Sequence, residues 1–339
     1  MNKNYIIPNE WAIVEEGFDV ENVEASESLF SIGNGSMGQR ANFEEDYSGK
    51  TFQGSYIGGI YYPDKTRVGW WKNGYPEYFA KVLNAPNWIG IHIQINATIL
   101  DLNVCEISNF RRELNMKEGW LSRSFNAILP SGDKIEVHAK RFISVKYNEV
   151  GAIEYSIKAV NFSGEIVFSP YLDAGIENED SNYDEFFWET LKIVEGSNNG
   201  CILAKTLKTE FQVATAMEVD FAINNQRISV NQETTIEDKA LIYSYKLPVS
   251  EGDIATTYKY ASYTSSLNYQ KEELINAALK NVNHAKEIGF EQLLNNQKQS
   301  WETIWETADI IIEGDIQAQQ GIRFNIFQLN QTYMGTDAR

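Results

Sequence analysis

Three glycines near the N-terminus have the spacing of a dinucleotide-binding loop. They are Gly33, Gly35 and Gly38, within SLFSIGNGSMGQRANFEE. Such a loop needs a strand before its first glycine and an apolar helix after its third, because the helix N-terminus binds the phosphates. SLFSI is a possible strand, but the residues that follow are polar and soon reach Gly49 and Gly54. We therefore expect the glycines to permit tight backbone bends between strands.

A second candidate for chemistry is the acidic stretch NEDSNYDEFFWE, residues 178–189. Asp184 and Glu189 could act as an acid/base pair, and Asp180 with Asp184 could bind calcium. A calcium loop of the EF-hand type needs a stricter alternation of ligands and a central glycine. A solvated acidic loop is the preferred interpretation.

The stretch RVGWWKNGYPEYFAKVLNAPNW, residues 67–88, is rich in aromatic rings. It contains Trp70, Trp71, Tyr75, Tyr78 and Trp88. Aromatic faces stack on sugar rings, but large aromatic side chains also anchor cores and subunit interfaces. The core or interface interpretation is preferred, and a carbohydrate platform is the alternative.

Metal chemistry has little support in the sequence. His92, His138 and His284 are isolated, and Cys105 and Cys201 lie far apart. Neither set has the spacing of metal ligands, and two distant cysteines make no disulfide framework. We expect no metal and no cofactor.

The charge and hydropathy of the chain exclude two classes of partner. The formal net charge is −18, so the surface repels nucleic acid and anionic membranes. No run approaches the roughly 20 apolar residues of a membrane span. The N-terminus lacks the basic and apolar regions of a signal peptide, which predicts a cytoplasmic location.

Short alternating runs dominate the sequence from about Trp11 to Thr264. In IGIHIQINATILDL, residues 89–102, four isoleucines at every second position lie on one face, and NATI supplies a turn. Period two predicts a half-buried antiparallel strand. Many such runs in series, with no helical patterns between them, predict a mainly β fold built on a large antiparallel β-sandwich over residues 1–264.

The pattern changes near Ser265. Helical steps predict two helices, with apolar positions at Leu274, Ala278, Val282, Ala285 and Ile288, then at Leu293, Leu294, Trp301, Ile304 and Trp305. DIIIEGD is a short β-like run that ends in a helix N-cap, Asp315. The last helix carries Ile322, Ile326, Leu329 and Tyr333 on one face. An apolar helical face needs a partner, which is either the sandwich or a further domain.

Several of these stretches resemble, in order, the disaccharide phosphorylases of glycoside hydrolase family 65. They are ESLFSIGNGSMGQRANFEE, GSYIGGIY, GYPEYFAKVLNAPNWIGI, FRRELNMKEGWLSRSF, PYLDAGIENEDSNYDEFFWE and EGDIQAQQGIRFNIFQLNQTY. They cover the chain almost end to end and look most similar to the maltose phosphorylase branch. The resemblance implies an N-terminal β-sandwich (1–264), a helical linker (265–314) and the first helix of a truncated (α/α)6 catalytic barrel (315–339).

The resemblance also implies a reaction. Family members cleave an α-glucosidic bond with inorganic phosphate and invert the anomeric centre, so that maltose gives β-glucose 1-phosphate and glucose. An inverting hydrolase needs an acid and a base, but phosphate is already an anionic nucleophile, so one general acid and a phosphate pocket suffice. These parts belong to the barrel beyond Arg339. We carry over no catalytic residue and expect this chain alone to be inactive.

The resemblance suggests roles for parts of this chain. The sandwich would serve structure, dimerisation and support of the active site, with inorganic phosphate as co-substrate and the disaccharide bound through the barrel. Phe187 and Trp188 would pack, with Phe186, at an inter-domain surface or near the active-site mouth. Arg323 and Gln328 would face the barrel interior. The alternatives are a non-catalytic carbohydrate-binding β-sandwich module, or a sister specificity for trehalose or kojibiose.

Overall fold

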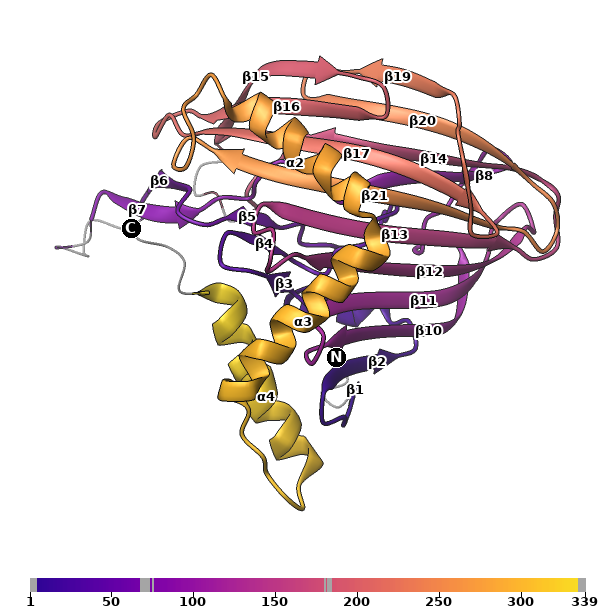
Figure 1. Cartoon of the computed structure of the whole chain (residues 1–339), viewed down its shortest axis with the longest axis horizontal. Helices are drawn as coiled ribbons and strands as arrows, with labels where there is room; N and C mark the ends of the chain where they lie inside the picture. The colour runs from indigo at the N-terminus through magenta and orange to yellow at the C-terminus, as the bar shows by residue number, and fades with distance from the viewer. Residues whose placement is uncertain (1–4, 68–73, 75, 180, 182–184, 335–339) are drawn as a thin grey trace.

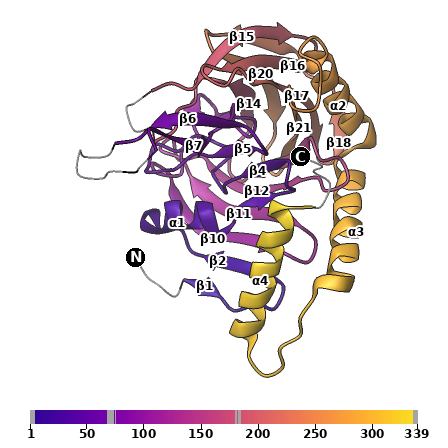
Figure 2. The ribbon, with the colours of Figure 1, turned by 90° about the vertical axis from the view of Figure 1, so that its left-hand side faces the viewer.

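The computed structural model describes residues 5–67, 74, 76–179, 181 and 185–334, and in this part of the chain most regular structure is antiparallel β-sheet. This confirms the mainly β fold class. Helices α2 (Leu274–Ile288) and α3 (Phe290–Ala308) lie on one side of the largest sheet, and the smaller sheets lie on the other (Figures 1 and 2).

The largest sheet contains 11 of the described strands. In spatial order they are β1 (Ile6–Ile7), β2 (Ala12–Glu16), β10 (Glu106–Asn115), β11 (Trp120–Ile128), β12 (Lys134–Ile143), β13 (Val150–Ala159), β21 (Ile254–Ser265), β17 (Gln212–Ile223), β16 (Asn199–Thr206) and β15 (Trp188–Glu195), with β18 (Gln226–Ile228) paired to β17. Strand β21 pairs with both β13 and β17, so the last strand of the series joins the two halves of the sheet.

Three smaller sheets accompany it. The five-stranded sheet has the order β19 (Gln232–Ile236), β20 (Ala240–Val249), β14 (Gly164–Asp173), β8 (Ile91–Ile95) and β9 (Thr98–Ile99). The other two are β3 (Ile32–Gly33), β4 (Met37–Gln39) and β5 (Ser55–Ile57), and the hairpin of β6 (Tyr61–Lys65) and β7 (Tyr78–Val82). The described residues therefore form a sandwich in which the large sheet is the wider layer.

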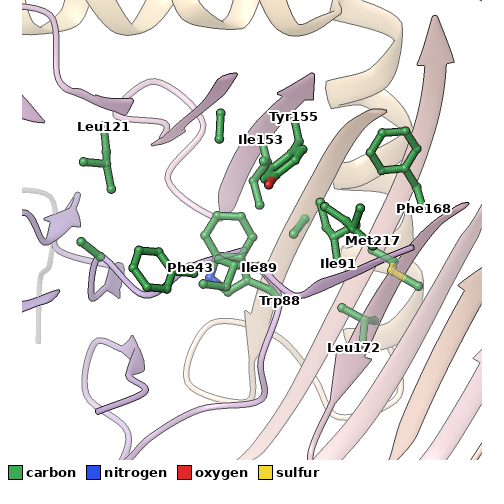
Figure 3. Close-up of a cluster of buried hydrophobic side chains, with 14 of the residues drawn as sticks. Phe43, Trp88, Ile89, Ile91, Leu121, Ile153, Tyr155, Phe168, Leu172 and Met217 are labelled. Carbon is green, nitrogen blue, oxygen red and sulfur yellow. The ribbon is translucent and has the colours of Figure 1, made fainter. Parts of the chain in front are cut away.

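The main core lies between the large sheet and the smaller ones, where aromatic and β-branched side chains interlock (Figure 3). The isoleucines at 89, 91, 93 and 95 are all buried there, and β8 turns into β9 at Asn96 and Ala97, as the period-two pattern and the NATI turn predict. Trp88 is fully buried in the same core. Its ring lies against Gly151 of β13, where a Cβ atom would come within 2.5 Å of the indole.

The opposite face of the large sheet is covered by α2 and α3, whose sequence patterns predict both helices. Ala278 and Val282 of α2 pack on Cys201 and neighbouring alanines of β17. Phe290, at the start of α3, packs against Phe142 of β12 with ring centroids 5.5 Å apart. The apolar helical stripes therefore bury themselves on the sheet, as amphipathic helices do.

Two local expectations are wrong. A short helix, α1 (Val23–Leu29), follows the 3₁₀ turn η1 (Val20–Asn22) before the glycine motif, so helix rather than strand occupies the start of SLFSI. The β-like run after Ala308 forms no strand: it meets no neighbouring strand, and Gln319 instead accepts from Ile312 N at 2.5 Å and donates to Ile310 O at 2.8 Å.

Helix α4 (Ile316–Thr332) begins at the predicted N-cap, where Asp315 accepts from Ala318 N at 3.0 Å. The sequence left open whether its apolar face packs on the sandwich or on a further domain. The side turned to the sandwich carries residues at intervals of four, namely Gln319, Arg323, Phe327 and Gln331. Leu329 is 71% exposed and Tyr333 is 64% exposed, whereas Ile322 and Ile326 are half-buried and Ile326 packs on the main core, so the predicted apolar row is only partly covered. Directional bonds, such as those from Gln320 Nε2 to Ile7 O and Ala12 O, decide this orientation.

We predict that Gly151→Ala lowers the free energy of unfolding by about 1–3 kcal/mol, because the added methyl overpacks the buried Trp88 ring. The matched control is Gly321→Ala in α4, where an added Cβ meets nothing within 4 Å. That change should gain roughly 0.5–1 kcal/mol from helix propensity. Urea denaturation of both variants measures the difference, and equal stability of the Gly151→Ala variant and the parent would contradict the packing described.

Candidate functional site

Segments that are far apart in the sequence meet at two adjoining pockets that share Tyr56 and Val82. The first has a volume of about 530 Å³ and lies between residues 31–40, 56–60 and 328–332. The second, of about 400 Å³, lies between residues 52–56, 81–84 and 177–179. We call the two pockets together the Tyr56 groove. It collects parts of the glycine motif, the aromatic stretch, the acidic stretch and the last helix.

The glycines shape the first pocket by admitting the backbone of α4. Gly35 has φ +83°, a conformation that favours glycine, and its N–H donates to Gln331 O at 2.7 Å. A Cβ on Gly33 would come within 3.2 Å of the same carbonyl, and one on Gly58 within 2.6 Å of Gly35 O. The glycines therefore permit a tight β3–β4 hairpin and its close approach to the helix, which confirms the structural interpretation of the motif.

Asn34, at the tip of this hairpin, fixes its position. Its Oδ1 accepts from the backbone N–H groups of Ser36 and Met37, at 3.0 and 2.8 Å. Its Nδ2 donates to Ser144 O at 2.7 Å and to Asn148 O at 2.9 Å, in the connection between β12 and β13. Both the oxygen and the nitrogen of the buried Asn34 amide have hydrogen-bond partners, so the hairpin cannot shift without losing several hydrogen bonds.

Buried arginines hold the irregular segment that follows the hairpin. Arg141 of β12 donates to Arg40 O at 2.9 Å and Asn42 O at 2.8 Å, and pairs with Glu44 Oε1 at 2.6 Å. Arg123 of β11 pairs with Glu44 Oε2 at 2.7 Å and with both oxygens of Glu45. These side chains are almost inaccessible to solvent. The large sheet thereby positions one wall of the groove through charge-assisted hydrogen bonds.

The protonation of this cluster follows from its geometry. Burial by itself would raise the pKa of Glu44, but the guanidinium groups of Arg141 and Arg123 outweigh it and hold the pKa below its ordinary value. Glu45 and Glu44 raise the pKa of Arg123 against the opposing effect of burial. Glu44 and Arg123 are therefore ionised at neutral pH.

Of the aromatic candidates that the structure describes, Trp88, Phe187 and Trp188 are in the core, whereas Tyr78 of β7 is 45% exposed. Trp88 is fully buried, so its ring is not available to a sugar. Phe187 stacks on Tyr62 with centroids 4.1 Å apart, and Trp188 donates from Nε1 to Asn84 O at 2.7 Å. Phe187 and Trp188 thus pack inside this chain, whereas the neighbouring Phe186 is 45% exposed.

Arg323 and Gln328, both on α4, have different surroundings. Arg323 is buried against the sandwich: it pairs with both carboxylate oxygens of Asp309, at 2.8 and 2.9 Å, and its guanidinium lies 3.6 Å from the centroid of the Trp11 ring. Gln328 lines the Tyr56 groove and accepts from Gln331 Nε2 at 2.5 Å. Among the candidates that the structure describes, Gln328 is the one in the groove.

The remaining candidates do not form a site in the described chain. Trp70, Trp71, Tyr75, Asp180 and Asp184 lie outside the described residues. Glu189 is about half exposed and pairs with Lys205 at 3.1 Å. Among the residues that the structure describes, no three His, Cys, Asp or Glu side chains are grouped to hold a metal ion. Over the same residues, no helix combines the length and apolar character of a membrane span.

Residue-type reasoning missed the groove residues Tyr56, Gln39, Asn84 and Gln331. None of them has a sequence spacing that indicates chemistry, since they come from separate segments. The signal that could have found them is the family resemblance, because GSYIGGIY and QLNQTY are among the stretches that carry it and both line the groove.

Comparisons with known proteins agree with this resemblance. A family model for the N-terminal domain of glycosyl hydrolase family 65 matches residues 13–304. The chain is 40% identical to a maltose phosphorylase of Bacillus subtilis over 345 residues, which cover 100% of this chain and 44% of the relative. It is 32% identical to an α,α-trehalose phosphorylase of Thermoanaerobacter brockii, covering 99% of this chain and 45% of the relative.

A solved structure matches the same extent of the chain. It is that of a putative kojibiose phosphorylase from human microbiome, with a TM-score of 0.88 and 26% sequence identity. The match covers 99% of this chain and 43% of that one. The chain thus spans less than half the length of the relatives it matches.

We predict that Glu44→Gln lowers the free energy of unfolding by about 3–5 kcal/mol at pH 7, because it leaves the buried Arg141 without its paired carboxylate and removes one of the two carboxylates bound to Arg123. A carboxylate whose pKa is lowered by folding stabilises the protein above its ordinary pKa of about 4.3 and loses that effect as the pH falls through the lowered value. The difference between parent and variant should therefore shrink below about pH 4.3.

Urea denaturation at a series of pH values measures this difference. The matched control is Glu233→Gln, which removes the charge of an exposed glutamate paired with Lys246 and should change stability little at any pH. A Glu44→Gln penalty that stays constant down to the acid unfolding of the parent would show that the ion pairs do not account for it.

Proposed function

We propose that this chain forms the N-terminal part of an inverting α-glucoside phosphorylase. The chain belongs to glycosyl hydrolase family 65, and it matches the N-terminal domain of that family. The proposed substrate is maltose, since the identity is higher with a maltose phosphorylase than with trehalose or kojibiose phosphorylases. Inorganic phosphate is the co-substrate, and no cofactor is required. A cytoplasmic location and a homodimeric state of the full-length enzyme are part of the same proposal.

The proposed reaction exchanges one bond at the anomeric carbon for another. A phosphate oxygen attacks C1 of the glucosyl unit from the face opposite the glucosidic oxygen, the C1–O bond breaks, and a general acid protonates the departing oxygen. The products are β-glucose 1-phosphate and glucose. Because phosphate supplies the nucleophile, no base is needed to activate water. We assign no general acid within the described residues.

The observation that carries the proposal is that the match to a maltose phosphorylase runs through α4, whose exposed side carries Leu329 and Tyr333. The opposite side of α4 is fixed to the sandwich by Gln320, Arg323 and Gln331. Large apolar side chains left exposed on a helix whose other side is fixed are suited to contact a further layer of structure. We propose that this layer is the catalytic part of the enzyme.

The alternative function is a carbohydrate-binding β-sandwich without catalytic activity. The feature that favours it is the Tyr56 groove, because residues of this chain line both of its pockets. The family match favours the phosphorylase, and trehalose or kojibiose phosphorolysis is the alternative specificity.

We predict that the 339-residue chain releases no glucose 1-phosphate from maltose and phosphate, and that the protein obtained by continuing the reading frame to its stop codon does. The reason is that, in this proposal, the general acid and the phosphate pocket belong to the catalytic part and not to the N-terminal domain. A coupled assay of glucose 1-phosphate measures both proteins, with trehalose and kojibiose as competing substrates.

The outcomes separate the proposals. Activity of the longer protein on trehalose or kojibiose alone would replace the proposed specificity. Activity of the 339-residue chain would show that the general acid is in this chain, and inactivity of both proteins on all three disaccharides would favour the binding module.

We also predict that the isolated chain self-associates through the exposed side of α4, and that Leu329→Lys weakens this association about tenfold, because it places a charge in an apolar contact. Sedimentation velocity over a range of protein concentrations measures the effect. Val104→Lys, at a residue that is 58% exposed and distant in sequence, is the matched control and should leave association unchanged. A chain that stays monomeric at all concentrations would contradict the prediction.

A further inference from the structure

We propose that Lys259 is an uncharged amine in the folded chain, and that it forms an acid-sensitive latch that joins the two layers of the sandwich until it is protonated. The inference concerns this chain alone and does not depend on the phosphorylase activity. Lys259 lies on β21 of the large sheet, between Ile153 of β13 and Val219 of β17, and it is completely buried. Completely buried lysines are rare, because the ammonium group is strongly hydrated in water.

The side chain of Lys259 crosses from the large sheet to the five-stranded sheet. Its Nζ donates to Gly90 O, just before β8, at 2.8 Å, and to Tyr171 O, in β14, at 2.7 Å. Gly90 O also accepts from Tyr171 N at 3.1 Å, so the same carbonyl links all three segments. The lysine therefore joins the ends of two paired strands in one layer to the central strand of the other.

The number of acceptors around Nζ matches an amine better than an ammonium group. A neutral amine has two N–H donors, and an ammonium group has three. Within the described part of the chain, Nζ has two acceptors, both of them uncharged carbonyls, and it forms no ion pair with a carboxylate. An ammonium group would leave a third donor and a full charge uncompensated in the core, which is costly.

The ionisable groups on the same face of the large sheet are themselves uncharged. They are the phenols of Tyr155 on β13 and Tyr263 on β21, and burial raises the pKa of both. Burial lowers the pKa of Lys259 well below its ordinary value, and no opposite charge counteracts this effect. The pKa shift therefore agrees with the count of donors and acceptors.

A succession of stacked groups leads from Lys259 to the surface. The centroid of the Tyr171 ring lies 5.7 Å from Nζ, and His92 stacks on this ring with centroids 4.3 Å apart. His92 Nδ1 lies 2.6 Å from Asp46 Oδ1, and both side chains are partly exposed. Burial, Asp46 and Asp173 raise the pKa of Tyr171, so these charges act on the phenol. Water that hydrates a protonated Lys259 would displace the Tyr171 ring, and we therefore expect acid to loosen the joint between β8 and β14.

The direct test is NMR of the 339-residue chain with isotope-labelled lysine side chains. At about pH 8, below the ordinary lysine pKa of about 10.4, we expect one Nζ resonance with the chemical shift of an amine. The other lysines should give ammonium resonances, and Lys259→Met should lack the amine resonance. Titration of the parent resonance needs no variant, so it tests the proposal even if Lys259→Met does not fold. Ammonium shifts for every lysine at this pH would overturn the proposal.

The second test compares the unfolding equilibrium constants of the parent and Lys259→Met in urea at a series of pH values. The unfolded parent takes up a proton at a higher pH than the folded parent does, so the folded state is favoured at high pH. The ratio of the parent constant to the variant constant should rise about tenfold per pH unit as the pH falls from about 10.4 to the lowered pKa. Below that pKa the ratio should stay constant.

The matched control is Lys134→Met, at an exposed lysine at the start of β12, which should give a constant ratio over the same pH range. Amide hydrogen exchange locates the latch. Lowering the pH through the pKa of Lys259 should reduce the protection of β8 and β14 and leave that of β2 and β10 unchanged. A constant ratio for Lys259→Met, an equal slope for Lys134→Met, or a loss of protection spread evenly over the sheets would each contradict the proposal.

Discussion

Buried arginines on neighbouring strands of the large sheet are the constraint on which the described structure depends. Arg123 of β11 and Arg141 of β12 hold the carboxylates of Glu44 and Glu45, and Arg141 also binds two backbone carbonyls of the segment that carries them. Isolated buried charges are prohibitively costly, so strands and segment determine each other's position. The segment has no regular structure of its own, and these bonds replace the hydrogen bonds of a strand.

The glycine hairpin depends on that anchor, and α4 depends on the hairpin. Because residues 40–45 are fixed on the sheet, the β3–β4 hairpin before them presents Gly33 and Gly35 to the end of α4. The helix then turns Gln320, Arg323 and Phe327 toward the rest of the chain and leaves Leu329 outside. A chain of polar, directional contacts thus sets the orientation of the helix on which the catalytic part is proposed to be built.

The Tyr56 groove is a consequence of the same arrangement. Its walls are the hairpin, the end of α4 and the residues around Asn84 and Glu177, which lie far apart in sequence. Each wall is held by hydrogen bonds to backbone groups, such as those from Asn34 to Ser144 O and from Trp188 to Asn84 O. A groove built on such fixed walls is pre-formed, which lowers the cost of binding a ligand.

The sequence by itself determined the features that depend on local periodicity and backbone freedom. Period two at residues 89–95 predicts a buried strand, steps of three and four predict α2 and α3, Asp315 predicts the start of α4, and Gly35 predicts a tight bend. The tertiary structure alone decided which face of α4 is buried. It also decided that Ile310 and Ile311 are exposed and form no strand, and that Arg323 and Trp188 are buried. These outcomes depend on partners hundreds of residues away, such as Ile7 O for Gln320, and a local pattern contains no information about them. The groove is undetermined by spacing for the same reason, since Tyr56, Glu179 and Gln328 become neighbours only when the sheets and α4 have packed.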